Sequence, residues 1–211
     1  MGSTRTQKAG AFCGGYHTCW KNMMKDQITV ADADGEHVVS RVFSWDLEDL
    51  TVPQKHFHLA KAYLDSCIHV FEGIIGDALP ATFSHAQSAA FLFEHGLELF
   101  LKGGIAQAGR HVPTHHNIQQ IYREFSNLYP GKKFQFEGRI EEAVTQDPNR
   151  PHGEFTRYPI DKSGSVWMGH SDFVLELWLE QMQAFRKDFE RLTPLIEERY
   201  GKSSEQPNSS D

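Results

Sequence analysis

The chain has little of several features that define common classes of protein. Only three of its 211 residues are cysteines, which is too few for a disulfide framework. No apolar run approaches the ~18 residues of a membrane span, and the N-terminus lacks the apolar region of a secretion signal. We therefore expect no membrane-spanning segment and a location in the reducing cytoplasm.

The chain also has fewer basic than acidic residues. Lys and Arg number 21 against 28 Asp and Glu, which gives a formal net charge of -7. Because non-specific binding to phosphates depends on accumulated basic side chains, this balance argues against a broad nucleic-acid-binding surface. Contact with RNA would have to use a local basic patch. The hydrophobic content of 39% is ordinary for a globular chain and predicts one real core.

Several catalytic signatures are missing. The Gly-Gly pairs at 14–15 and 103–104 do not continue into a P-loop or a dinucleotide-binding fingerprint. No serine lies in a G-x-S-x-G turn, and no internal repeat is present. These absences predict a protein that needs no cofactor.

A group of cysteines and histidines near the N-terminus raises the question of zinc. Cys13, His17 and Cys19, joined by His56 or His58, could supply four ligands. Their spacing is not the paired C-x-x-C arrangement, and scattered histidines arise easily in a chain that has 12 of them. We expect no bound metal.

Both ends of the chain differ from its middle. Within residues 1–50, two β-rich runs flank Asp34 and Gly35, and an Asp-Gly pair favours a hairpin turn because glycine adopts positive φ without strain. Residues 202–211 are too polar to pack, which predicts a disordered tail. The sequence therefore predicts a small N-terminal β-hairpin, a structured domain over 51–201 and a tail.

Helical periodicity dominates residues 51–201. Thr51 and Pro53 suit the start of a helix that runs to about residue 75. The run 84–105 is apolar almost all round, which predicts a buried central helix. Gly103 and Gly104 are expected to end that helix or fray its last turn.

Further helices are predicted after this central one. Apolar residues at spacings of three and four indicate a helix over 114–128 with Thr114 as a cap, a short one over 139–145, and a long one over 172–200. The predicted fold is mainly α: an antiparallel bundle of four to five helices with the small N-terminal β-hairpin.

Four polar residues interrupt the apolar central helix. Gln87, Glu94, Glu98 and Lys102 follow one another at spacings of seven, four and four, so they share one face. Glu98 and Lys102 are spaced for an ion pair worth ~0.2 to 0.5 kcal/mol on a helix surface, whereas Glu94 and Glu98 are like charges. The stripe therefore either faces solvent or lines a cleft or a dimer seam, where buried charges need partners.

These patterns resemble a known family. The E-H-x-x-E-x-x-x-K run of the central helix, the following H-H-N-I-x-x-I-Y run and Arg157 before the last helix are similar to motifs of the HEPN superfamily of prokaryotic helical domains. The resemblance covers roughly residues 53–200. It implies a helical bundle, often dimeric, that works on or beside RNA and nucleotides in toxin–antitoxin, phage-defence or RNA-processing systems. Some members are metal-independent ribonucleases, and others are non-catalytic binding modules.

Active members of that family carry an arginine followed four to six residues later by a histidine, usually at the start of the last long helix. Arg157 has no histidine at this spacing. The match in this chain is Arg110 with His115 or His116, and it precedes the third helix instead.

Two interpretations of this Arg-His group remain open. If it faces the stripe, a histidine could take the proton from an RNA 2′-hydroxyl while Arg110 or Lys102 stabilises charge on the phosphate. Alternatively, Thr114 and Asn117 cap the third helix, and the histidines at 115 and 116 only fill its first turn.

The sequence thus predicts one leading function and one alternative. The leading hypothesis is a cytoplasmic HEPN-like homodimer that binds RNA, a nucleotide or a partner protein, with metal-independent ribonuclease activity if the candidate residues come together. The alternative is a non-catalytic structural or regulatory bundle that binds another protein. The catalytic candidates are Arg110, His115 and His116, and the binding candidates are Glu94, Glu98, Lys102 and Arg157.

Overall fold

The computed structural model of the chain describes residues 26–32, 35–41, 45–144 and 174–201. The chain is mainly helical, as the sequence predicted. It divides between Asp49 and Leu50 into two compact units. The group Cys13, His17 and Cys19 and the polar residues 202–211 lie outside the described residues.

The described residues of the first unit form two strands and a short helix. β1 (Asp26–Asp32) pairs antiparallel with β2 (Gly35–Arg41), and Ile28 lies opposite Val39 in the ladder. β-branched residues suit such an extended, pleated chain. Asp34 of the predicted turn lies outside the described residues. Helix α1 (Trp45–Glu48) follows β2.

The second unit begins with helix α2 (Val52–Ile75), whose start is the one predicted. Thr51 is the N-cap, and its backbone N–H donates to Oε1 of Gln54 at 3.0 Å, while Pro53 lies in the first turn. Apolar side chains three and four positions apart form the buried face of the helix: Phe57, Ala60, Leu64, Cys67, Ile68, Phe71 and Ile74. α2 therefore packs through one continuous apolar stripe.

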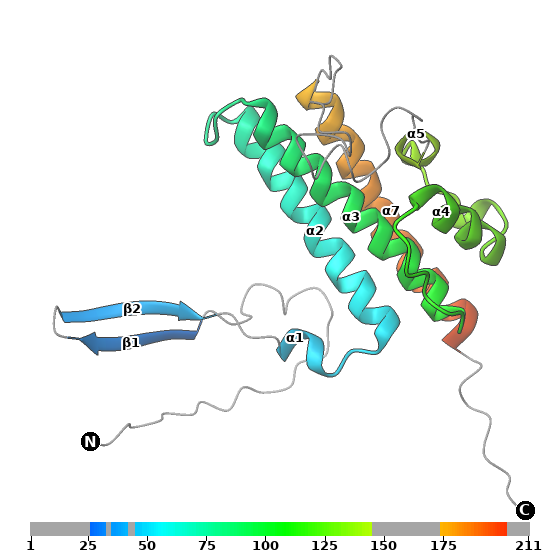
Figure 1. The fold of residues 1–211 in the computed structure, drawn as a ribbon, viewed down its shortest axis with the longest axis horizontal. Helices are drawn as coiled ribbons and strands as arrows, with labels where there is room; N and C mark the ends of the chain where they lie inside the picture. The colour runs from blue at the N-terminus through cyan, green and yellow to red at the C-terminus, as the bar shows by residue number, and fades with distance from the viewer. Residues whose placement is uncertain (1–25, 33–34, 42–44, 145–173, 202–211) are drawn as a thin grey trace, which may run out of the picture. The chain divides into compact units, whose positions relative to one another are not determined.

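The central helix α3 (Phe83–Gln107) packs against α2, α4 and α7 (Figure 1). The prediction that Gly103 and Gly104 end or fray it is wrong, because α3 continues to Gln107. Both glycines are buried, and a Cβ atom at Gly104 would overlap the ring of Phe125. The two glycines let neighbouring side chains approach the helix backbone closely, and packing on both sides outweighs their poor helix propensity.

Shorter helices connect α3 to the last long one. Those within the described residues are α4 (Ile118–Leu128), the 3₁₀ helix η2 (Lys132–Phe134) and α5 (Ile140–Val144). The long helix is α7 (Leu175–Gly201). The N-cap of α4 is Asn117, whose Oδ1 accepts the backbone N–H of Gln120 at 3.0 Å. Thr114 is therefore not the cap. Asn117 is, because its short amide directly precedes the first buried residue of the helix, Ile118.

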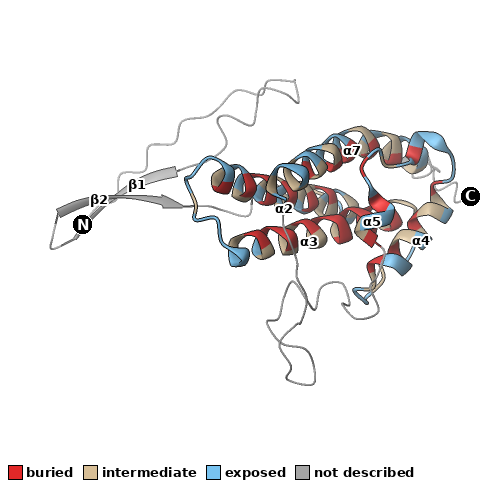
Figure 2. Cartoon of the chain, turned by 90° about the horizontal axis from the view of Figure 1, so that it is seen from above, coloured by how far each residue is buried: buried red, intermediate tan, exposed pale blue. Residues whose placement is uncertain are grey.

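Aromatic rings fill the core of the helical unit. Phe100 of α3 stacks on Phe189 of α7 with 4.1 Å between the ring centroids, and it also lies 5.3 Å from the ring of Phe57 on α2. Figure 2 shows the buried faces of α2, α3 and α7 turned toward one another. This packing places α3 in the interior of the unit and so determines where its polar side chains can point.

Candidate functional site

The site is built on a buried ion pair within α3. The Nζ atom of Lys102 lies 2.8 Å from Oε1 of Glu98, one helical turn away. Only 5% of Glu98 and 7% of Lys102 is exposed. The spacing predicted this pair, but burial makes it different from a surface pair, because each charge depends on the other for compensation.

His116 joins the pair from the segment that connects α3 to α4. Its Nδ1 atom lies 2.9 Å from the same Oε1 atom of Glu98, while 60% of its side chain is exposed. The connecting segment therefore returns along α3 and brings two residues 18 positions apart into contact. We refer to Glu98, Lys102 and His116 as the Glu98 cluster.

The carboxylate of Glu98 is held in its ionised form. Burial alone would raise the pKa of Glu98, but the hydrogen bond and charge of Lys102, and then those of His116, outweigh burial and hold this pKa below its ordinary value of 4.5. The ionised carboxylate accepts hydrogen bonds and donates none. It can therefore orient the imidazole of His116 through Nδ1 and leave Nε2 on the exposed side.

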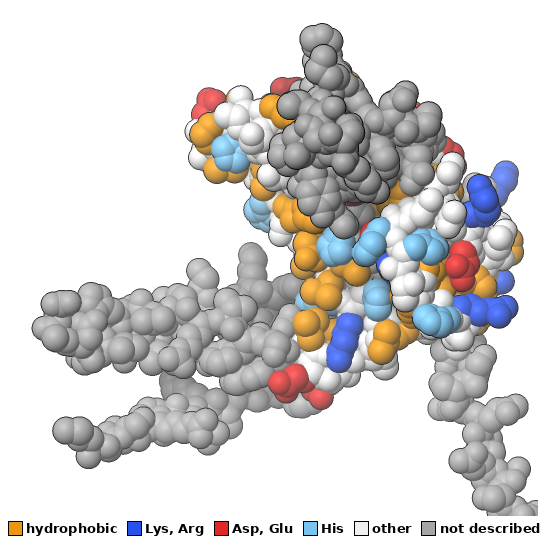
Figure 3. Space-filling model, in the orientation of Figure 1, with side chains coloured by type: hydrophobic (Ala, Val, Ile, Leu, Met, Phe, Trp, Pro, Cys, Tyr) orange, Lys and Arg blue, Asp and Glu red, His pale blue; other side chains and the backbone are white. Residues whose placement is uncertain are grey.

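His115 lies beside this cluster in the sequence but has a different partner. The backbone N–H of Asn117 donates to Nδ1 of His115 at 3.3 Å. The interpretation in which Thr114 and Asn117 cap the third helix is right about Asn117. Because α4 begins at Ile118, however, the two histidines do not fill its first turn. Both are exposed in the segment before it. Figure 3 shows several histidine side chains gathered on this face of the helical unit, with Lys and Arg side chains beside them.

The structure does not bring Arg110 into the Glu98 cluster. Arg110 follows α3, and its backbone N–H donates to the carbonyl oxygen of Ile105 at 3.2 Å. Its side chain is exposed, and within the described residues no ion pair links it to Glu98. It shares only the connecting segment with His116.

The remaining binding candidates are more loosely related to the site. Gln87 and Glu94 are half-buried on α3, so the predicted stripe is fully buried only at Glu98 and Lys102. Arg157 lies outside the described residues. In the part of the chain that the structure describes, no three Cys, His, Asp or Glu side chains are grouped to hold a metal ion.

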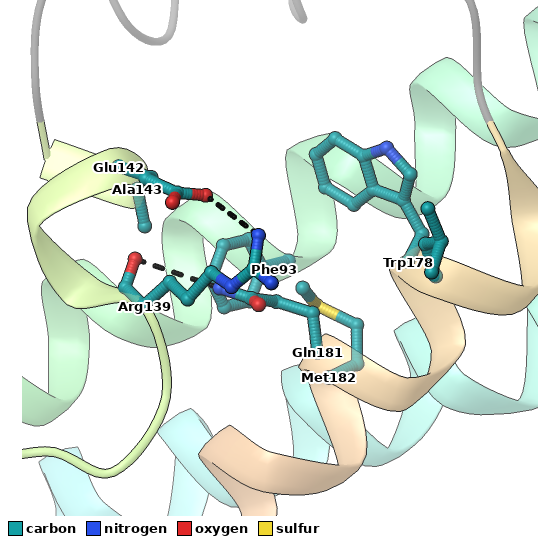
Figure 4. A pocket seen from close by; sticks show the side chains of 8 residues that line it. Phe93, Arg139, Glu142, Ala143, Trp178, Gln181 and Met182 are labelled. Carbon is teal, nitrogen blue, oxygen red and sulfur yellow. Dashed lines mark hydrogen bonds and ion pairs between the residues drawn. The ribbon is translucent and has the colours of Figure 1, made fainter.

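A separate pocket of about 250 Å³ lies between α3, α5 and α7 (Figure 4). The buried side chains of Phe93 and Met182 line it together with Trp178, and Gln181 donates to the carbonyl oxygen of Arg139 at 3.5 Å beside it. Phe93 is five residues from Glu98 along α3, which places the pocket and the Glu98 cluster on different faces of that helix.

No sequence pattern predicted this pocket, whereas Asn117 was one of the two residues expected to cap the third helix in one of the interpretations left open. The pocket forms from three elements that are distant in the chain, so no local pattern marks it. Asn117 had a detectable signal, since an asparagine directly before an apolar periodic run is a strong N-cap. Its effect on the neighbouring His115 depends on how the connecting segment folds.

None of the described helices is long and apolar enough to cross a bilayer. In comparisons with known proteins, no family model, no curated protein and no solved structure matches the chain. The geometry of the Glu98 cluster is therefore the observation from which we infer a function.

Proposed function

We propose that this chain is a HEPN-like helical protein that binds RNA and cleaves it without a metal ion, with His116 as the general base. The observation that supports this function is the 2.9 Å contact between Nδ1 of His116 and the buried carboxylate of Glu98. A histidine that a carboxylate orients through Nδ1 presents Nε2 as a proton acceptor. A general base needs an accepting atom within reach of the proton that it takes, and this arrangement supplies one.

RNA supplies the group on which such a base acts. Nε2 of His116 takes the proton of a 2′-hydroxyl as the 2′-oxygen bonds to the neighbouring phosphorus. The bond from phosphorus to the 5′-oxygen breaks, and the imidazolium returns its proton to that oxygen, directly or through water. The products are a 2′,3′-cyclic phosphate and a 5′-hydroxyl. DNA lacks the 2′-hydroxyl and is left intact.

The other candidates support this step in different ways. Lys102 is a positioning residue, because it keeps Glu98 ionised and fixed while Glu98 orients His116. Arg110, exposed on the same connecting segment as His116, is the group we assign to phosphate charge. With a net charge of -7, the chain must bind RNA through such local groups and not through a broad basic surface.

The test is cleavage of a mixture of structured and single-stranded RNAs by the purified full chain in the presence of EDTA. We expect cleavage by the wild type and a loss of ~100-fold or more in His116→Ala, because a general base contributes about that much. Arg110→Ala should weaken binding. Cyclic phosphate ends on the products would identify the proposed chemistry.

His69→Ala is the matched control. His69 is also exposed, and its Nδ1 lies 2.6 Å from a backbone carbonyl oxygen, so it presents the same ring edge without a buried carboxylate behind it. The His69→Ala variant should therefore cleave RNA at the wild-type rate. An inactive, well-folded wild type, or a His116→Ala variant with full activity, would overturn the proposal.

The resemblance also suggests a cellular setting, which we propose as a cytoplasmic toxin–antitoxin or phage-defence system. Expression of the wild type should then slow the growth of a bacterial host, and expression of His116→Ala at the same level should not. Equal effects of the two proteins on growth would argue against this setting.

A second candidate function, a non-catalytic bundle that binds a protein partner or a second copy of the chain, is favoured by apolar side chains near the start of α7. Val174 is 51% exposed and Leu177 62% exposed. Association through such a surface should be insensitive to salt, whereas RNA binding should weaken steeply as salt rises. Light scattering on the wild type and on Leu177→Lys tests the dimer, which this substitution should dissociate.

A further inference from the structure

His115 and His116 are neighbours in the chain, but their Nδ1 atoms face opposite kinds of hydrogen-bonding group. Nδ1 of His116 lies 2.9 Å from the carboxylate of Glu98, which can only accept a hydrogen bond. Nδ1 of His115 lies 3.3 Å from the backbone N–H of Asn117, which can only donate one. In a neutral imidazole one ring nitrogen carries the proton and the other accepts. The partners therefore place the two rings in opposite tautomers.

The tautomer decides what each ring offers to a ligand. The ring of His116 carries its proton on Nδ1 and presents a lone pair at Nε2. The ring of His115 carries its proton on Nε2 and presents an N–H there. Both side chains are exposed, so a bound molecule can reach these edges. His115 is not a second base, because Asn117 already occupies its lone pair.

The start of α4 fixes this arrangement. Asn117 is the N-cap of the helix, and its side chain accepts the N–H of Gln120 at 3.0 Å. The backbone N–H of an N-cap residue has no partner within its own helix. It is therefore available to His115, and the rigid helix start holds it in place.

We propose that His115 is a phosphate-binding residue whose Nε2–H donates to a non-bridging oxygen of the phosphodiester that His116 attacks through the 2′-hydroxyl. This inference rests on the proposed function and names its ligand: a phosphodiester with a neighbouring hydroxyl, as in RNA. The two roles differ because Nδ1 of His116 contacts the carboxylate of Glu98, whereas Nδ1 of His115 accepts a backbone N–H.

Substitution by glutamine distinguishes a phosphate-binding donor from a general base. Its side-chain amide N–H₂ lies at about the place of Nε2 in histidine, and it is a donor without being a base. We expect His115→Gln to keep cleavage within about 3-fold of the wild type, and His115→Ala to raise KM about 10-fold with little change in kcat, because a bond to phosphate is made before and during the reaction. His116→Gln should lower kcat ~100-fold or more.

Binding gives a measurement that does not need turnover. The probe is a single-stranded oligonucleotide of mixed sequence with 2′-deoxy sugars throughout, which has the phosphates but cannot react. We expect His115→Ala to bind this probe about 10-fold more weakly, and His115→Gln and His116→Gln to bind it like the wild type. An equal loss of cleavage activity in His115→Gln and His116→Gln would overturn the inference. Unchanged binding of the probe by His115→Ala would overturn it as well.

Nitrogen NMR of the imidazole rings tests the tautomers directly. We expect the Nδ1-protonated form at His116 and the Nε2-protonated form at His115 in the neutral rings of the folded wild type. The same tautomer at both residues would contradict the inference even if RNA is cleaved. Opposite tautomers together with normal probe binding but no cleavage would remove the proposed ribonuclease function and leave His115 as a phosphate-binding residue.

Discussion

Lys102 and Glu98 form a short ion pair inside the helical unit, with 2.8 Å between Nζ and Oε1 and side chains that are only 8% and 7% exposed. Lys61 and Asp65 have the same spacing on α2 and a similar distance of 3.0 Å, but their side chains are 31% and 30% exposed. The same spacing of four residues, with acid and base in opposite order, thus occurs in two environments. Water can replace a lost partner only in the exposed one, so the two pairs should respond differently to mutation.

The first prediction concerns the loss of one partner of the buried pair. Glu98→Gln removes the negative charge and leaves Lys102 buried without compensation. We expect the free energy of unfolding to fall by on the order of 3 kcal/mol, as is usual when one partner of a buried pair is removed. Urea denaturation at neutral pH measures this change.

Two further variants make this prediction specific. Adding Lys102→Met to Glu98→Gln should recover most of the loss, because the uncompensated charge is then gone. Glu142→Gln is the matched control: Glu142 pairs with Arg139 at 3.6 Å, but its side chain is 69% exposed. It should change stability by less than ~1 kcal/mol. Equal effects of the two Glu→Gln changes would show that burial does not decide the cost.

The second prediction is loss of stability in acid. The pKa of Glu98 is lower in the folded chain than its ordinary value of 4.5, so the folded state binds this proton less readily than the unfolded state does. The resulting stabilisation is complete above a pH of 4.5 and is lost as the pH falls through the lower folded-state pKa. Urea denaturation from about pH 7 to about pH 3 should show a steeper decline for the wild type than for Glu98→Gln with Lys102→Met. Parallel curves would contradict this assignment.

Features that depend on nearby residues were the ones the sequence predicted well. The start of α2 followed from Thr51 and Pro53, whose effect is confined to one helical turn. The pairing of Glu98 with Lys102 followed from helical spacing in the same way. Neither feature requires knowledge of what packs against the helix.

Features that depend on distant residues were assigned wrongly or left open between two interpretations. Gly103 and Gly104 look like helix ends, yet Phe57 and Phe125 pack against them and α3 continues. The sequence left open whether the Arg-His group faces the polar stripe of α3. His116 does contact Glu98, because the connecting segment returns along α3, whereas Arg110 does not join this contact. Such contacts are set by tertiary packing, which overrides local propensity.

The third prediction concerns Asp188 of α7, which is 1% exposed. Its Oδ2 atom accepts the backbone N–H groups of Glu137 and Gly138, both at 2.8 Å, and so attaches the segment before α5 to α7. Asp188→Ala leaves both amides without this acceptor. We expect a loss of on the order of 3 kcal/mol in the free energy of unfolding, since the bond of Gly138 is buried and that of Glu137 partly buried, and an unpaired buried group costs about 1 to 3 kcal/mol.

A neighbouring carboxylate on the same helix provides the control. Glu190 also contacts basic side chains, Lys61 at 3.5 Å and Arg186 at 3.7 Å, but 53% of its side chain is exposed. Glu190→Ala should therefore cost less than ~1 kcal/mol. Hydrogen exchange should locate the effect of Asp188→Ala in the amides of Glu137 and Gly138. Protection of these amides that matches the wild type would refute the proposed role of Asp188.

The fourth prediction is a reversal of the usual effect of alanine in a helix. Replacing an interior helical glycine with alanine normally stabilises a protein by about 1 kcal/mol. A Cβ atom at Gly104 would overlap the ring of Phe125. The carbonyl oxygen of Gly104 also accepts a hydrogen bond from the hydroxyl of Tyr129 at 2.7 Å. This turn of α3 therefore cannot move away from Phe125 without breaking that bond. Gly104→Ala should therefore lower the free energy of unfolding by about 1 to 3 kcal/mol.

A double-mutant cycle shows whether the ring of Phe125 causes this loss. Phe125→Leu makes room beside Gly104 at the expense of core packing, so Gly104→Ala should be much less harmful when added to Phe125→Leu than when made alone. Thermal unfolding of the wild type, the two single variants and the double variant gives the coupling. Additive effects, or stabilisation by Gly104→Ala alone, would mean that the glycine is not required for the approach of Phe125 to α3.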